Sequence, residues 1–153
     1  MKVFDCFMYF DEDLVLDLRL NTLNSNVDFF VIVESTYNHK GEKRNLKFDI
    51  KKFAKFKDKI KYIVYDIEPE GIETISENDN ESIKSSKYIL NAARRENGQR
   101  NYIIQGLLNS DDEDVILISD LDEIPNLSNH NLKNIDEKIL LFKQDMFYYK
   151  FNL

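Results

Sequence analysis

Cysteine is nearly absent from this sequence, and long apolar runs are absent altogether. The 153 residues contain one cysteine, Cys6, so disulfide bonds within the chain are excluded. Because Cys6 lies in an apolar segment, we expect a buried, reduced thiol and a cytoplasmic protein. No stretch approaches the roughly 20 apolar residues that a membrane-spanning helix needs. The first residues, Met1 to Asp5, do not follow the plan of a signal peptide, so none is expected.

Positive charge is in deficit. Lysine and arginine together number 21 against 28 acidic residues, which gives a net charge of −7. This balance argues against a general nucleic-acid-binding protein, since neutralising a phosphate backbone requires a basic surface. It leaves room for a single nucleotide, because a bound metal can supply positive charge locally. The length and the hydrophobic content of 42% suit one globular domain, which we place over residues 1–153.

Apolar segments alternate with helical patterns along most of the chain. Strands are predicted over residues 2–9, 28–35, 60–66 and 115–118. Helices are predicted from the acidic residues 11–13 to about 24, around 48–56, and from 82 or 85 to about 109. This alternation predicts an α/β fold with a mostly parallel sheet and helices on both faces.

Finer features follow from the same patterns. In the first helix, Leu14, Leu18 and Leu23 are expected to face the core, and Gly98 is expected to kink or divide the long helix. The acidic, polar residues 67–82 are expected to form a mobile loop. Residues 138–143 and 146–151 are predicted to be two further strands. The last strand is aromatic and stops abruptly, so we expect truncation at the C-terminus and either a homodimer formed through this exposed strand or aggregation.

Three carboxylates follow the apolar run that ends at Ile118. Asp120, Asp122 and Glu123 precede Pro125, which turns the chain away. The carboxyl ends of strands are where open α/β sheets bind ligands. Asp120 and Asp122 are two residues apart, so in extended backbone both project to one side and repel each other. A divalent cation such as Mg²⁺ or Mn²⁺ would relieve that repulsion. The alternative is an acidic turn without a ligand.

Other polar residues are predicted to reach the same edge of the sheet. Acidic residues follow the other strands as well, and they are Asp11, Glu12, Glu34 and Asp66. Glu34 follows the second strand, so it can accept hydrogen bonds from ribose hydroxyls or remain a solvated strand end. Arg95 and Arg100 are candidates for phosphate contacts, although Arg100 can instead pair with Glu96 one helical turn away. His39, in the loop after the second strand, is a substrate contact or an exposed loop residue.

The order and spacing of several stretches resemble glycosyltransferase family 17. This family includes the enzyme that adds the bisecting β-1,4-linked N-acetylglucosamine to the core mannose of N-glycans. The most specific string runs from Ser119 to Pro125. The other matching stretches are Asp5-Cys6-Phe7 with Asp11-Glu12, Phe30 to Ser35 with His39-Lys40-Gly41, Arg95-Glu96 with Gln99-Arg100, and Phe147-Tyr148-Tyr149 with Asn152.

The resemblance implies a GT-A-type, Rossmann-like fold with an Asp-x-Asp motif. It also implies a metal-dependent inverting transfer of a sugar from a UDP-sugar to a glycan acceptor. Asp122 and Asp120 would hold Mn²⁺ or Mg²⁺ against the diphosphate. Arg100 and Arg95 would contact the phosphates, Glu34 or Asp11 the nucleoside, and Glu123 would be the general base. Members of the family usually continue beyond the last aromatic strand, so we expect the donor-binding part here.

Two alternatives remain open at the level of sequence. A strand that ends in Asp-x-Asp also suits a metal-dependent phosphohydrolase with an aspartate nucleophile. In haloacid dehalogenase-type enzymes, however, Thr or Val is expected two residues beyond the motif, whereas Glu123 and Ile124 follow here. The other alternative is a non-catalytic module that binds a nucleotide sugar without transferring it.

Overall fold

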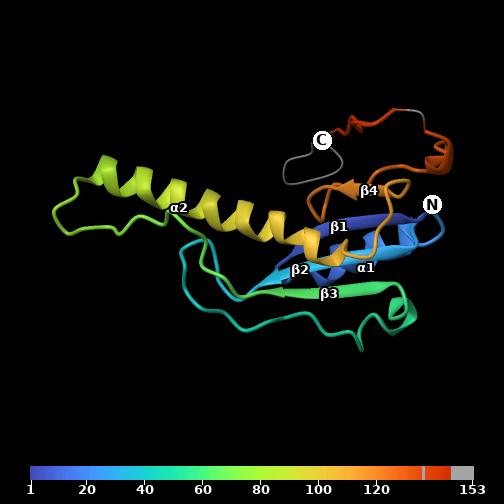
Figure 1. Cartoon of the computed structure of the whole chain (residues 1–153). Helices are drawn as coiled ribbons and strands as arrows, with labels where there is room; N and C mark the ends of the chain where they lie inside the picture. Colours follow the sequence, from blue (N-terminus) through green and yellow to red (C-terminus); the bar gives the residue numbers. More distant parts are fainter. Residues whose placement is uncertain (136, 146–153) are drawn as a thin grey trace.

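A four-stranded parallel sheet forms the centre of the molecule in this computed structural model, which describes residues 1–135 and 137–145. The strands are β1 (Val3–Tyr9), β2 (Phe29–Ser35), β3 (Ile60–Tyr65) and β4 (Val115–Ile118), in the spatial order β3-β2-β1-β4. All three pairings are parallel, so the four carboxyl ends point the same way (Figure 1). The predicted parallel α/β fold is therefore confirmed, and the strand bounds agree within one or two residues.

Both faces of the sheet are covered. The described residues also form two α-helices, α1 (Asp13–Leu23) and α2 (Glu81–Asn101), and three short 3₁₀ helices, η1 (Ala54–Phe56), η2 (Tyr102–Gly106) and η3 (Leu132–Asn134). On one face, α1 packs on strand residues such as Phe7 and Phe30. On the other face, Ile103 of η2 packs with Phe4 and Cys6. Successive residues of a strand point to opposite faces, which is why neighbours such as Cys6 and Phe7 enter different clusters.

The prediction for the buried side of α1 is wrong for two of its three residues. Leu14 and Leu18 are 83% and 58% exposed, and only Leu23 is buried. The buried side consists of Leu16, Arg19, Leu20 and Leu23. Leucine recurs at every second position from 14 to 20, and residues two apart point to nearly opposite sides of a helix, so the pattern offers two apolar sides. Arg19 lies on the side that is buried, where it pairs with the buried carboxylate of Asp5 on β1.

Helix α2 is continuous through Gly98, so the predicted division into two helices is wrong. A side chain at position 98 would collide with the hydroxyl of Tyr65, and the glycine therefore allows a close approach between the helix and β3. Asn91 is the residue that α2 buries, whereas Ile89 and Leu90 are largely exposed. The helix extends past the carboxyl ends of the strands (Figure 1). It ends at Asn101, earlier than predicted, and η2 continues to Gly106.

The remaining segments are irregular. Residues 138–143 do not form the predicted strand, and Ile139 and Leu141 are 80% and 87% exposed. Their alternating pattern has no sheet surface to bury against in the described part of the chain. The predicted strand over residues 146–151, and with it the expected dimer contact, lies outside the described residues. In residues 1–135 and 137–145, no helix is both long and apolar enough to cross a membrane.

The acidic loop between β3 and α2 is tied to the helix. The Asn91 amide group donates to the carbonyl of Glu73 and accepts from its amide, at 2.8 and 2.9 Å. Lys87 forms an ion pair with Asp79 at 2.6 Å. Residues 66–80 therefore run along α2 rather than projecting freely from the domain (Figure 1).

Candidate functional site

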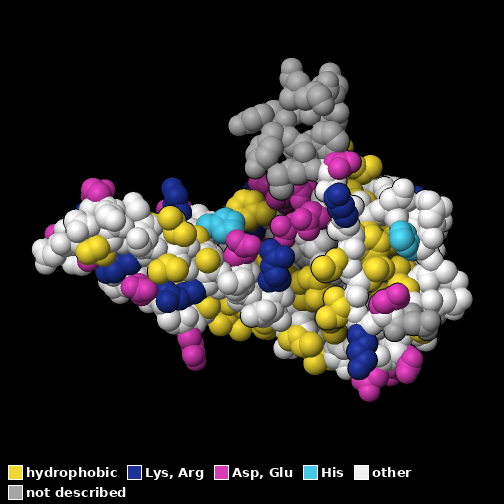
Figure 2. Space-filling model, turned by 90° about the horizontal axis from the view of Figure 1, so that it is seen from above, with side chains coloured by type: hydrophobic (Ala, Val, Ile, Leu, Met, Phe, Trp, Pro, Cys, Tyr) yellow, Lys and Arg dark blue, Asp and Glu magenta, His cyan; other side chains and the backbone are white. Residues whose placement is uncertain are grey.

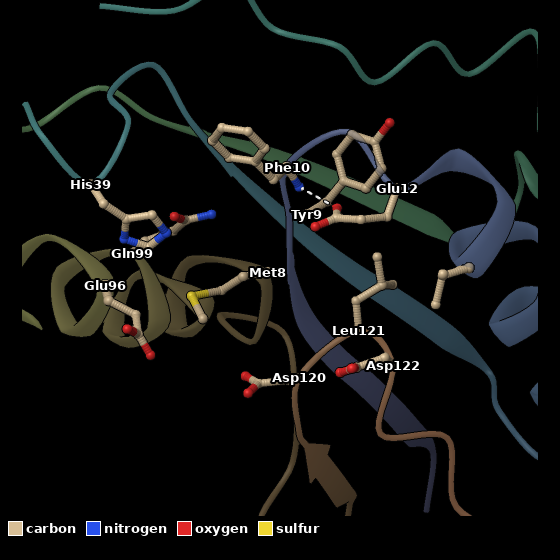
Figure 3. Close-up of a pocket in the computed structure, with 11 residues that line it drawn as sticks. Met8, Tyr9, Phe10, Glu12, His39, Glu96, Gln99, Asp120, Leu121 and Asp122 are labelled. Atoms are coloured by element: carbon tan, nitrogen blue, oxygen red, sulfur yellow. Dashed lines mark hydrogen bonds between the residues drawn. The ribbon is translucent and has the colours of Figure 1, made fainter. Parts of the chain in front are cut away.

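An open pocket of about 400 Å³ lies at the carboxyl edge of the sheet. Its walls come from the end of β1, the start of α1, the loop after β2, the middle of α2 and the turn after β4. This position follows from the topology, since the loops that leave parallel strands meet at one edge. The lining residues are Met8, Tyr9, Phe10, Glu12, Val15, His39, Glu96, Gln99, Asp120, Leu121 and Asp122 (Figure 3).

The pocket is rich in carboxylates. Glu12, Glu96, Asp120 and Asp122 line it, and His39 lies across from the two aspartates (Figure 3). Seen from above, acidic side chains gather near the middle of this face, beside hydrophobic and basic side chains (Figure 2). Such a wall repels a free diphosphate, so an anionic ligand needs a cation to accompany it.

The turn after β4 brings Asp120 and Asp122 to the pocket. The amide of Glu123 donates to the carbonyl of Asp120, and the amide of Ile124 donates to the carbonyl of Asp122, both at 3.0 Å. Leu121, between the two aspartates, is only 7% exposed and packs into the core. The structure thus places the two predicted metal ligands in the same pocket.

Glu123 has a different position. Its carboxylate accepts a hydrogen bond from the amide of Asp120 at 3.0 Å and so closes the turn. It lines a second cavity, beside β4 and residues 140–144, and not the main pocket. The predicted role as general base stays a prediction, and this carboxylate already has an acceptor role in holding the turn.

Arg100 forms both of the contacts that the sequence left as alternatives. Its Nη2 atom donates to Glu96 at 3.0 Å and to Asp120 at 2.9 Å. Burial lowers the pKa of Arg100, but the Asp120 and Glu96 carboxylates raise it more, so the net shift is upward. Arg100 therefore already supplies positive charge to Asp120, and it lies beside the predicted metal ligands.

Arg95 lies at the rim of the pocket. Its Nε and Nη2 atoms donate to Glu68 at 2.8 and 2.5 Å, and its Nη1 atom donates to the carbonyl of His39 at 3.2 Å. Asp11 is exposed and does not line the pocket, whereas its neighbour Glu12 does. The Glu12 carboxylate accepts the amides of Phe10 and Asp11, both at 3.0 Å. The phosphate role of Arg95 and the nucleoside role of Asp11 stay predictions.

Glu34 is fully buried and does not line the pocket. Its carboxylate accepts hydrogen bonds from the amides of Lys47 and Phe48, at 2.7 and 3.1 Å, and from the hydroxyl of Tyr62 at 2.8 Å. Arg44 completes the set as an ion pair at 2.9 Å. Burial, and then the bond to Glu34, raise the pKa of Tyr62. Glu34 thus anchors the segment after β2, and its predicted ribose contact remains untested.

Arg19 is the residue near the site that the sequence-based reasoning missed. It is fully buried, and it contacts the turn that carries Asp120 and Asp122. Two features of the sequence could have revealed it: an arginine on a leucine-rich side of a helix, and Asp5 within an apolar strand. A buried charge requires a partner of opposite sign, and these two are the matching pair.

The two aspartates fit a cation that obtains its other ligands elsewhere. In the described part of the chain, no group of three or more histidine, cysteine or acidic side chains is arranged to hold a metal ion. Mg²⁺ is commonly held by one or two carboxylates together with substrate phosphates and water. Asp120 and Asp122 match that donor set, with the diphosphate as the remaining partner.

Comparison with known proteins agrees with the resemblance seen in the sequence. The family model for glycosyltransferase family 17 matches residues 1–153. No curated protein and no solved structure matches the chain. The match favours sugar transfer over the phosphohydrolase and over the non-catalytic module.

Proposed function

The chain belongs to glycosyltransferase family 17 and is a glycosyltransferase, and we propose that it uses a UDP-sugar and a divalent metal to glycosylate a glycan acceptor with inversion. N-acetylglucosamine is the sugar that the family suggests. One observation carries this proposal: Asp120 and Asp122 line the same pocket, at the carboxyl edge of a parallel sheet. We also propose a GT-A-type arrangement of the domain and, from the free Cys6 thiol, a cytoplasmic location.

In this proposal both the acidic turn and α2 contribute residues that bind the diphosphate. Asp122 and Asp120 hold Mn²⁺ or Mg²⁺, which when bound offsets the charge that develops on the leaving nucleoside diphosphate. Arg100, beside Asp120, contacts the phosphate oxygens and adds charge where it accumulates. His39, Gln99 and the apolar side of the pocket surround the rest of the donor.

The remaining proposed roles belong to residues that do not line the main pocket. Arg95 contacts the donor from the rim, and Asp11 lies next to the pocket-lining Glu12. Glu34 contributes by anchoring the segment after β2, in addition to its proposed nucleoside contact. Inversion requires a base that removes the proton from the acceptor hydroxyl, and Glu123 is our candidate.

Calorimetry with UDP tests the donor site directly. We expect binding that requires Mn²⁺ or Mg²⁺ and is weakened at least tenfold by Asp122→Asn. Asp112→Asn is the matched control, because Asp112 is an exposed acid before β4 and does not line the pocket. Equal affinity in excess chelator would refute the metal role. Absence of UDP binding under all conditions would refute the donor site.

A further inference from the structure

The guanidinium of Arg19 joins α1, β1 and the acidic turn. It donates six hydrogen bonds. Two of these, from Nε and Nη2, reach the two carboxylate oxygens of Asp5 at 2.8 and 2.7 Å. Nη2 also reaches the hydroxyl of Ser119 at 2.7 Å. Nη1 donates to the carbonyls of Asp120, Leu121 and Glu123 at 2.7, 3.1 and 3.3 Å.

Stability alone does not account for this pair. The side chains of Arg19 and Asp5 are both fully buried, and they lie 2.7 Å apart. Removing two charges from water is costly, and apolar replacements of similar volume are often as stable or more stable. The other residues on this side of α1 are leucines, which would pack against Phe7 without that cost. The contacts that the pair makes with the turn therefore suggest a role beyond filling the core.

Of the three carbonyls that Arg19 contacts, one belongs to Asp120, which carries a pocket carboxylate, and those of Leu121 and Glu123 lie on either side of Asp122. Holding these carbonyls inward, toward α1, leaves the side chains of Asp120 and Asp122 on the pocket side of the turn (Figure 3). The contact is made through backbone atoms, so it sets the direction of both carboxylates without neutralising either. Asp5 holds the guanidinium from the opposite side, so its orientation is fixed before any ligand arrives.

We propose that Arg19, oriented by Asp5, is a positioning residue for the donor site. It fixes the backbone of residues 119–123, so that both aspartates face the pocket before a metal or a diphosphate binds. This inference rests on the proposed function as far as the ligand is concerned. A guanidinium offers five N–H donors on three nitrogens in one plane, whereas a lysine has three donors on one nitrogen and cannot replace all of these contacts.

Two variants separate positioning from simple structural support. Arg19→Lys keeps the positive charge and removes the planar guanidinium. The double variant Asp5→Val with Arg19→Met removes both charges. In the double variant the carbonyl of Asp120 keeps the Glu123 amide, and the carbonyl of Glu123 keeps the Ser119 hydroxyl. The carbonyl of Leu121 loses Arg19 as its donor, so we expect the double variant to fold with a Tm somewhat below that of the wild type.

The first measurement is hydrogen exchange in the ligand-free protein. Both variants should raise exchange at the amides of Glu123 and Ile124 at least tenfold, while the amides of β2 keep their protection. Leu23→Ala is the control, because Leu23 is a buried residue of the same helix whose apolar side chain donates no hydrogen bond to the turn. Unchanged exchange at these two amides in both variants would overturn the inference.

The second measurement is the affinity for UDP with Mn²⁺, well below each Tm. We expect at least a tenfold loss in both Arg19 variants, and no loss in Leu23→Ala at a comparable Tm. If the losses merely follow Tm across the three variants, Arg19 is a structural residue only. If the wild type does not bind UDP, the proposed function fails, and the exchange comparison still decides whether Arg19 fixes the turn.

Discussion

Replacing Arg100 with glutamine should change two affinities in opposite directions. Arg100 lies 2.9 Å from Asp120 in the ligand-free protein, so it opposes the binding of a metal ion to the same carboxylate. A divalent ion about 5 Å from a single positive charge is repelled by roughly 1.7 kcal/mol in water, and salt reduces this to about 1 kcal/mol. Arg100→Gln should therefore bind Mn²⁺ alone about fivefold more tightly.

The effect on the nucleotide has the opposite sign. A charge-assisted hydrogen bond to phosphate contributes about 1.5–3 kcal/mol, so affinity for UDP at saturating Mn²⁺ should fall roughly 10- to 150-fold. Uridine lacks phosphate and should be little affected. Calorimetry with Mn²⁺, UDP and uridine measures all three values. The side chains of Arg100 and Asp120 are 33% and 50% exposed, which is why the repulsion of the metal ion is discounted for screening.

Glu96→Gln is the matched control for this experiment. It removes the other partner of Arg100 and leaves the contact with Asp120 in place. Because Glu96 lines the pocket and its pair with Arg100 is only partly exposed, we expect UDP affinity to stay equal or rise slightly, and not to fall. Loss of UDP and uridine binding to the same extent in Arg100→Gln, or of neither, would show that Arg100 acts only in a surface ion pair.

Three further predictions concern the fold. Burial, and then the Asp5 carboxylate, raise the pKa of Cys6 to about 12. A thiol reagent should therefore label Cys6 only after unfolding, and rapid labelling of the native protein would contradict this. Gly98→Ala should lower stability by about 1 kcal/mol despite the better helix propensity, because the methyl group displaces Tyr65; a higher midpoint in urea would refute the packing argument. Hydrogen bonds from the amides of Asp111 and Lys2 lower the pKa of Asp114, so its contribution to stability is present above about pH 4 and lost on acidification. Asp114→Asn should accordingly lower Tm at pH 7 and have a shrinking effect as the pH falls below about 4.

The sheet and the acidic turn were predictable because their patterns are local. Apolar runs such as Phe30–Val33 bury both faces of a strand, which is a property of parallel sheets. The position of Asp120 and Asp122 then follows, since residues after parallel strands meet at one edge. To predict that the two aspartates line one pocket, only the order of the strands in the sheet had to be known as well.

The roles of individual side chains depended on partners far away in the sequence. Glu34 follows a strand as a ribose ligand would, yet Arg44 and Tyr62 enclose it, and neither contact can be inferred from spacing. The buried side of α1 could not be chosen between two leucine-rich sides without knowing that Asp5 pairs with Arg19. Residues 138–143 alternate like a strand, but a strand forms only where a sheet surface receives it.

The contacts of Arg95 have a kinetic consequence for the pocket. One guanidinium joins the loop after β2, through the carbonyl of His39, to the loop after β3, through Glu68. Gly41, with a φ of +87°, lets the first loop lie directly against this side chain. The two loops are therefore tied to one side chain of α2, and opening either one strains the other. Because His39 lines the pocket, the two loops should open in one step, and hydrogen exchange in both loops should share one rate.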